Sequence, residues 1–234
     1  MDTSAAARTY TLTPFSESHQ FADAAINNMT FKNGKFDFAI GGSAYKLGVQ
    51  TPDAPQKMCA NSAEGQHIHV IVDINPYDAK YTPQFEYQIH DGEHYLLAFL
   101  SRSYHESIKT DKAYKAVKVK VENNGFKTEE AITGPMLFYS RPKGTYVGKE
   151  NTDKVMLDFY VVNAPLGTDY KVKVEINAEQ TVVLDQWKPY YIEGLPMGDN
   201  KIKLTLIGKD GNPLDVPNNP VERVFTLSAD PIEQ

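Results

Sequence analysis

Two stretches of the sequence resemble each other, and this similarity constrains the fold more than any other feature. The first stretch comprises residues 69–75 (HVIVDIN) and 91–100, and the second comprises residues 171–177 (KVKVEIN) and 197–206. Each consists of a predicted strand that ends in Val-acid-Ile-Asn, a spacer, a turn with glycine and a second strand. A unit of this size that occurs twice indicates one β-sandwich fold used twice.

The rest of the chain also indicates an all-β protein. Short alternating apolar segments are separated by Gly, Pro, Asn and Asp turn signals about every 8–12 residues, as in antiparallel sandwiches. We predict two tandem immunoglobulin-like antiparallel β-sandwich domains. The predicted segments are a tail and lead-in over residues 1–28, a first domain over 29–142 and a second over 148–234. The candidate linker between the domains is Arg141-Pro-Lys-Gly144.

Composition narrows the function. The formal net charge of −6 argues against a nucleic-acid partner, which requires a basic face. No apolar run approaches the ~20 residues that span a bilayer. Cys59 is the only cysteine, so no intrachain disulfide is possible, and we expect it to be a small buried apolar group. A P-loop, a GxSxG motif and an HExxH motif are all missing from the sequence, so we expect no enzyme.

The first eight residues (MDTSAAAR) are small and polar and resemble a low-complexity tether. They lack the hydrophobic segment of a signal peptide. Our hypothesis is that this sequence begins just after a removed signal or a lipid-anchored cysteine. The protein would then contact a membrane only through an N-terminal lipid anchor that is absent from the sequence.

The strand over residues 67–74 has one wholly apolar face. Because alternate residues of a strand share a face, Ile68, Val70 and Val72 should point to the core. His67 and His69 then share the opposite face and should point outward. We predict that residues 72–75 match residues 174–177 in the second copy. Val70 and Val72, and their counterparts Val172 and Val174, should be buried.

Histidines 67, 69, 90, 94 and 105 all lie in the first copy, and the second copy has none. In an immunoglobulin-like sandwich the strand beginning at His67 pairs antiparallel with the strand beginning at Tyr95. His67 and His69 should therefore lie near His105, and His94 near Asp73. One rim of the first domain would gather this histidine pair with Arg102, Tyr104, His105, Glu106 and Cys59.

Three interpretations of this rim remain open from the residues alone. The histidines are ordinary surface side chains. Alternatively, His67, His69 and His105 form a metal site, since three imidazoles suit zinc or copper. In the third interpretation, Arg102, Tyr104 and Glu106 contribute with the histidines to a site for a polar or anionic ligand.

Three runs resemble a group of uncharacterised exported proteins: residues 65–73 (GQHIHVIVD), 98–107 (AFLSRSYHES) and 193–198 (EGLPMG). These are predicted lipoproteins of Bacteroidetes-type bacteria, loosely labelled phosphopeptide-binding. The resemblance implies tandem immunoglobulin-like domains and a periplasmic or lipid-anchored location in the cell envelope. It implies no activity and no catalytic residues. We therefore predict a non-catalytic envelope binding or interaction protein whose functional surface lies on domain one, with an unknown protein or small-molecule partner. A metal-binding protein that uses zinc or copper is the alternative.

Overall fold

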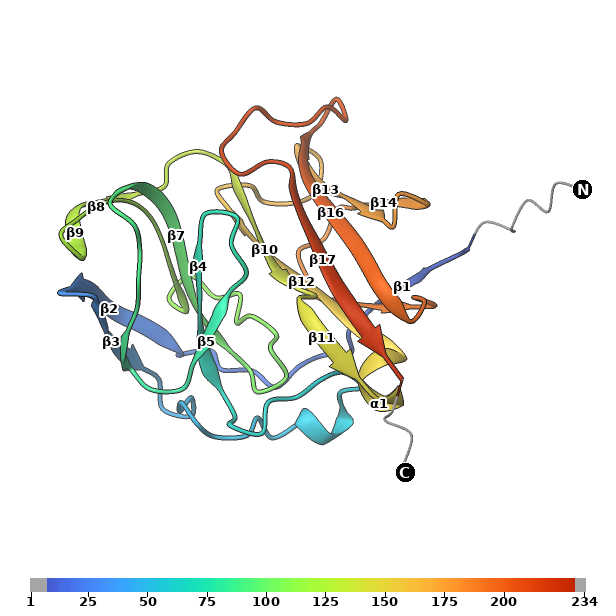
Figure 1. Ribbon diagram of the computed structural model, residues 1–234, viewed down its shortest axis with the longest axis horizontal. Coiled ribbons are helices and arrows are strands. Elements are labelled where there is room, and N and C mark those ends of the chain that lie inside the picture. Colours follow the sequence, from blue (N-terminus) through green and yellow to red (C-terminus); the bar gives the residue numbers. More distant parts are fainter. Residues whose placement is uncertain (1–7, 230–234) are drawn as a thin grey trace, which may run out of the picture.

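The computed structural model of the protein describes residues 8–229, which form four β-sheets stacked as four layers (Figure 1). The layers are β2-β3-β6, then β5-β4-β7-β8-β9, then β10-β12-β15-β1, and finally β11-β17-β16-β13-β14. The first two layers enclose one apolar core and the last two enclose another. The predicted all-β class is confirmed. Within residues 8–229 the helices are limited to the short η1 (Ala54–Gln56) and α1 (Lys149–Thr152).

The first sandwich owes its core to strand alternation. Ile68, Val70 and Val72 of β4 face Phe31 and Phe36 of the opposite sheet, as part of one buried apolar cluster. Its strands are β2 (Ala25–Lys32), β3 (Lys35–Gly41), β4 (His67–Val72), β5 (Asp78–Lys80), β6 (Gln84–Glu86), β7 (Gly92–Ser101), β8 (Tyr114–Glu122) and β9 (Gly125–Ala131).

The second sandwich is built in the same way, with Val172, Val174 and Ile176 of β13 in its core. Strand β11 pairs parallel with β17, and the other pairings of this sandwich are antiparallel. Its strands are β1 (Thr11–Pro14), β10 (Met136–Arg141), β11 (Gly144–Val147), β12 (Lys154–Val162), β13 (Tyr170–Ile176), β14 (Gln180–Leu184), β15 (Tyr190–Glu193), β16 (Gly198–Gly208) and β17 (Val221–Ser228).

The two related stretches occupy the same position in their sheets. Strand β4 lies between β5 and β7, and β13 lies between β14 and β16. Each ends at a residue with a left-handed backbone, Asp73 (φ 54°) or Asn177 (φ 51°). The Asp73 Oδ1 accepts a hydrogen bond from the backbone N–H of Tyr95 at 2.9 Å, and the Asn177 Oδ1 accepts one from Lys201 at 2.7 Å. The internal similarity therefore reflects a shared structural unit.

This geometry moves the predicted alignment of the first strands by two residues. Because Asp73 corresponds to Asn177, Val72 corresponds to Ile176, and the predicted match of Val72 with Val174 is wrong. The error has a simple physical cause. A strand repeats every two residues, so a shift of two keeps every side chain on its own face and leaves the apolar pattern unchanged.

The second strands of the two units keep their predicted alignment. Gly92 and Gly198 each stand three positions before the residue whose backbone N–H donates to that side chain, and both have positive φ. The predicted burial is also confirmed, since Val70, Val172 and Val174 are each 0% exposed.

The N-terminal expectation is wrong for residues 11–14. They form β1, which pairs antiparallel with β15 at the edge of the second sandwich. The chain then crosses to the first sandwich: Phe15 stacks on Tyr191 at 3.9 Å between ring centroids, and Phe21 enters the first core beside Tyr45. Two threonines, a leucine and a proline carry little strand signal, and pairing with an existing edge is what orders them. The tether expected at residues 1–7 lies outside the described part of the chain.

The predicted end of the first domain at residue 142 also needs correction. Strand β10 (Met136–Arg141) pairs with β12, so it belongs to the second sandwich. It lacks alternation because all its residues are buried: Leu137 and Tyr139 face the second core, while Met136 and Phe138 face the first sandwich. A strand buried on both faces resembles a continuous apolar run.

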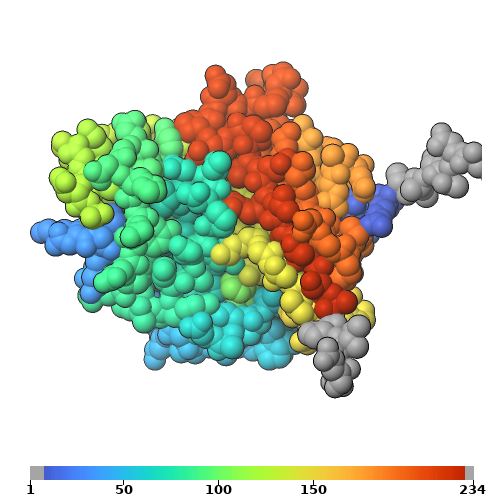
Figure 2. Space-filling view, viewed as in Figure 1, coloured from blue at the N-terminus to red at the C-terminus, as the bar shows by residue number. Residues whose placement is uncertain are grey.

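The two sandwiches pack against each other through a third apolar cluster. The outer face of β4 and β7 contributes Ile71, Leu97 and Phe99, which meet Met136, Phe138, Tyr160 and Val162 of the second sandwich. Figure 2 shows the yellow segment after β10 lying against the first sandwich. Every residue of β4 is consequently buried, whichever way its side chain points. In residues 8–229, no helix is long and apolar enough to cross a membrane.

Candidate functional site

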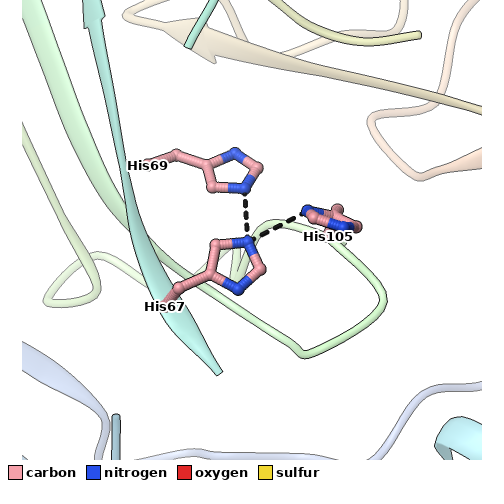
Figure 3. Close-up of side chains that lie close together, drawn as sticks. All are labelled: His67, His69 and His105. Carbon is pink, nitrogen blue, oxygen red and sulfur yellow. Dashed lines mark hydrogen bonds between the residues drawn. The ribbon is translucent and has the colours of Figure 1, made fainter. Parts of the chain in front are cut away.

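Three buried histidines meet between the sandwiches (Figure 3). His67 and His69 project from the same face of β4, and His105 projects from the loop after β7. The Nε2 of His67 lies 2.7 Å from the Nε2 of His69 and 3.0 Å from the Nδ1 of His105. One nitrogen from each of the three rings lies within 4.8 Å of the other two. We call this group the histidine cluster.

The outward face predicted for His67 and His69 is the face that the second sandwich covers. Both residues are 0% exposed, so the expectation of solvent-facing imidazoles is wrong. The alternation argument assigned them correctly to the side opposite the first core. It had no means of showing that a second sandwich closes over that side.

A tight loop brings His105 to this face. His67 pairs with Ser101, the last residue of β7, so the chain that follows must turn beside the start of β4. The backbone N–H of His105 bonds to the carbonyl of Arg102 at 2.9 Å, and that of Arg102 bonds to the carbonyl of Glu106 at 2.9 Å. His105 has a φ of 68°, in the left-handed region that histidine enters more readily than bulkier residues.

The hydrogen bonds of His67 define which of its nitrogens is free. Its Nδ1 lies 2.7 Å from the carbonyl oxygen of Gly65, which can only accept, so Nδ1 carries the proton. The Nε2 of a neutral His67 therefore presents a lone pair. The nearest ring nitrogens of His69 and His105 both point at that lone pair. A single lone pair makes one strong hydrogen bond, so the three nitrogens are better matched to a shared cation.

Besides its contact with His67, His69 is held by stacking. Its ring lies parallel to that of Tyr77, with centroids 3.7 Å apart and an interplanar angle of 6°. Its Nδ1 is buried and has no hydrogen-bond partner among residues 8–229. This nitrogen lies on the side of the ring away from the Nε2 that meets His67.

Burial keeps all three imidazoles neutral. The pKa of His67 falls from its usual 6.5 to about 4, chiefly because of burial and to a smaller extent because of the positive charges of Arg141 and Lys143. Burial also holds the pKa of His69 and of His105 well below the usual range. The neutral form of imidazole is also the one that ligates metal ions.

Two positively charged side chains of the second sandwich, Arg141 and Lys143, are linked to the cluster through Tyr77. Arg141 donates from Nε to the Tyr77 hydroxyl at 2.9 Å, and that hydroxyl lies 3.4 Å from the Nδ1 of His105. Lys143 donates to the Tyr77 carbonyl at 2.6 Å and lies 4.0 Å from the centre of its ring. Sequence reasoning missed these residues because it assigned Arg141 and Lys143 to a linker and Tyr77 to a loop.

Arg102, Tyr104 and Glu106, the predicted ligand contacts, bind other parts of the chain instead. The guanidinium of Arg102 donates to the carbonyl of His19 at 2.8 and 2.9 Å, and Glu106 accepts from Ser18. The Tyr104 hydroxyl donates to Asp53 at 3.1 Å. All three residues are buried. Arg102 and Glu106 hold the segment before β2 against the loop that carries His105, and Tyr104 holds the start of η1 against the same loop.

Cys59 and His94 lie outside the cluster. Cys59 is buried beside Tyr104, and burial raises the pKa of its thiol to about 12, so it behaves as an apolar group. The Nδ1 of His94 lies 2.7 Å from the Oδ2 of Asp73, as predicted. In the second sandwich Asn200 takes the place of His94 and bonds to Asn177 at 2.9 Å. His94 is therefore part of the shared scaffold.

Comparison with known proteins yields fold-level similarity alone. No protein-family model matches the sequence, and no curated protein matches it. Among solved structures, the fibronectin(III)-like modules of Clostridium thermocellum CbhA are 10% identical with a TM-score of 0.31. That match covers 86% of this chain and 90% of the other.

Two further structures are similar to the chain. The chicken interferon gamma receptor alpha chain is 8% identical with a TM-score of 0.24, covering 89% of this chain and 100% of that one. The Bacteroides ovatus protein SGBP-B, solved with a mixed-linkage heptasaccharide, is 9% identical with a TM-score of 0.24, covering 94% of this chain and 71% of that one. The functional argument therefore rests on the geometry of the histidine cluster.

Proposed function

We propose that this protein is a non-catalytic binding protein that holds one transition-metal ion, of the zinc or copper class, at His67, His69 and His105. The observation that carries the proposal is the convergence of three neutral, buried ring nitrogens within 4.8 Å of one another. Imidazole nitrogen is the ligand type shared by zinc and copper sites.

The distances fit a metal after a small adjustment. An ion with nitrogen ligands at 2.0–2.1 Å in tetrahedral geometry keeps those nitrogens about 3.3 Å apart. The contacts of His67 with His69 and His105 are 2.7 and 3.0 Å, so binding would widen these two by well under 1 Å. The ring nitrogens of His69 and His105, which lie within 4.8 Å of each other, would have to move closer together. Gly65 orients His67 through its other nitrogen, which is the supporting contact usual for a metal-bound histidine. Tyr77 orients His69 by stacking.

The site lies on the first sandwich and is closed by the second. Two ligands come from β4 and one from the loop after β7, while Arg141 and Lys143 cover them from the other side. A buried site with three protein ligands suits retention of an ion better than turnover of a substrate. We also propose a cell-envelope location, supported by the resemblance to exported lipoproteins and testable by fractionation of the source cells.

The first experiment uses the wild-type protein. Chelator-treated protein is titrated with zinc or with copper under reducing conditions, and bound metal is measured after gel filtration. We expect one ion per chain. Long-range ¹⁵N–¹H spectra should then show that three of the six histidine side chains shift on binding. Binding without a shift of His67, His69 and His105 would place the metal elsewhere and overturn the proposal.

Variants supply the second test. A His67→Ala, His69→Ala double variant should lose the stoichiometric ion. His69→Phe keeps a ring against Tyr77 while removing a ligand, so it separates loss of binding from loss of packing. His94→Ala is the matched control, because His94 lies in the same sandwich but outside the cluster. Unchanged affinity in His69→Phe, or equal loss in His94→Ala, would contradict the proposal.

A further inference from the structure

If the histidine cluster binds a metal, as proposed above, the positive side chains around it bear on which metal it binds. The inference below rests on that proposed function. Within residues 8–229 the group of potential ligands contains three imidazoles and no carboxylate or thiolate. The guanidinium of Arg141 and the ammonium of Lys143 are both linked to the cluster through Tyr77. Because the three ligands are neutral, they do not offset the charge of a bound ion. The ion would keep its full positive charge beside two positively charged side chains.

The electrostatic penalty rises with the charge of the ion. The repulsion between an ion and a fixed neighbouring charge is proportional to the ion's own charge, so a divalent ion meets twice the opposition of a monovalent one. Burial adds to the difference, because desolvation of an ion in a low-dielectric site grows steeply with its charge. Both effects disfavour Zn(II) relative to a monovalent ion.

The number of available ligands also disfavours Zn(II). Zinc is almost always four-coordinate, so a three-histidine zinc site needs a water or another group in the fourth position. The Tyr77 hydroxyl lies 3.4 Å from the Nδ1 of His105 and already accepts a hydrogen bond from Arg141. Of the three histidines, only His105 is exposed to solvent, over 9% of its surface, so there is little access for a water as fourth ligand. Cu(I), by contrast, accepts three imidazoles in a trigonal arrangement without a fourth ligand.

We infer that the histidine cluster is a three-coordinate Cu(I) site that discriminates against Zn(II). His67, His69 and His105 supply the ligands, while Arg141 and Lys143 supply the discrimination. Cu(II) is disfavoured as well, since it carries the same divalent charge and prefers tetragonal geometry, for which the cluster offers too few donors.

The test compares the two ions in the same protein under anaerobic conditions. Cu(I) affinity is measured by competition with a colorimetric Cu(I) chelator, and Zn(II) affinity by competition with a fluorescent zinc chelator. We expect one Cu(I) per chain and a zinc affinity at least 1,000-fold weaker, of the order that a charge difference of one gives in a poorly solvated site. Zinc binding equal to or tighter than Cu(I) binding would overturn this inference and leave the proposed metal site standing. Failure of both ions to bind would overturn the proposed function too.

A Lys143→Met variant tests the electrostatic cause. Lys143 is half-buried and binds a backbone carbonyl, so methionine can replace its stem without emptying the core. Removing one positive charge should strengthen binding of both ions, and the factor for Zn(II) should be about the square of the factor for Cu(I). Lys80→Met, which removes a lysine outside the cluster, is the matched control and should change neither affinity. Equal factors for the two ions in Lys143→Met would overturn the electrostatic selection.

Discussion

At the scale of single residues, this protein places three titratable side chains where water cannot reach them. His67 is fully buried, and burial lowers its pKa to about 4. A neutral imidazole is an ordinary part of a protein core, whereas a buried imidazolium beside Arg141 is strongly disfavoured. The cluster therefore links the stability of the fold to pH.

We predict that the metal-free protein loses stability as the pH falls from 6.5 toward 4. In this window the unfolded chain binds protons on these imidazoles and the folded protein does not, so the free energy of unfolding decreases with decreasing pH. His67 alone contributes about 3 kcal/mol, from a shift between 6.5 and about 4. The full contribution is present above pH 6.5. Denaturant unfolding at several pH values measures it.

The control for this prediction is a His67→Phe, His69→Phe variant, which keeps aromatic rings in the cluster but removes two titrating groups. Its free energy of unfolding should depend less on pH over the same range. A pH dependence equal to that of the wild type would show that other groups cause the acid sensitivity.

At the scale of elements, β4 serves two interfaces. Ile68 and Val70 pack in the first core, while Ile71 packs against the second sandwich. The sequence pattern predicted one buried face and one solvated face, which is the usual arrangement for an antiparallel sheet. The structure buries both faces because a second sheet covers the outer one.

A matched pair of substitutions tests this arrangement. Ile68 is 0% exposed on the inner face and Ile71 is 1% exposed on the outer face. We expect Ile68→Ala and Ile71→Ala to lower the free energy of unfolding by similar amounts, about 2–5 kcal/mol each. Urea unfolding of the two variants provides the measurement. If Ile71→Ala is nearly neutral while Ile68→Ala is not, the outer face of β4 is open in solution.

At the scale of the whole molecule, polar contacts join the two sandwiches alongside the apolar cluster. Asp158 of β12 is 0% exposed. Its Oδ1 lies 2.6 Å from the Nζ of Lys109, and its Oδ2 accepts from the backbone N–H of Ser107 at 2.9 Å. Both partners lie in the loop that carries His105. The carboxylate therefore ties the position of the third histidine to the second sandwich.

We predict that the two sandwiches unfold together in one calorimetric transition, because they share a buried interface. Asp158→Ala leaves the N–H of Ser107 and the ammonium of Lys109 without their partner, and should cost about 3 kcal/mol. Asp158→Asn keeps an acceptor for Ser107 and should cost less. Two separate transitions in the wild-type protein would show that the interface contributes little to stability.

The sequence by itself determined the class of fold and the local geometry. Alternation placed Val70 and Val72 in a core, paired the strand of His67 with that of Tyr95, and brought His105 near His67 and His69. These features depend on neighbours along the chain and on the period of a strand, which residue letters record directly. Pairing of Asp73 with His94 was predictable for the same reason.

Only the tertiary structure decided how the two sandwiches meet. It placed β1 in the second sandwich, moved β10 across the predicted boundary and buried the histidine cluster under Arg141 and Lys143. Contacts between surfaces far apart in sequence arise from shape and from the total apolar area removed from water, and no local periodicity encodes them. The neutral state of the cluster, and with it the proposed choice of metal, follows from that packing.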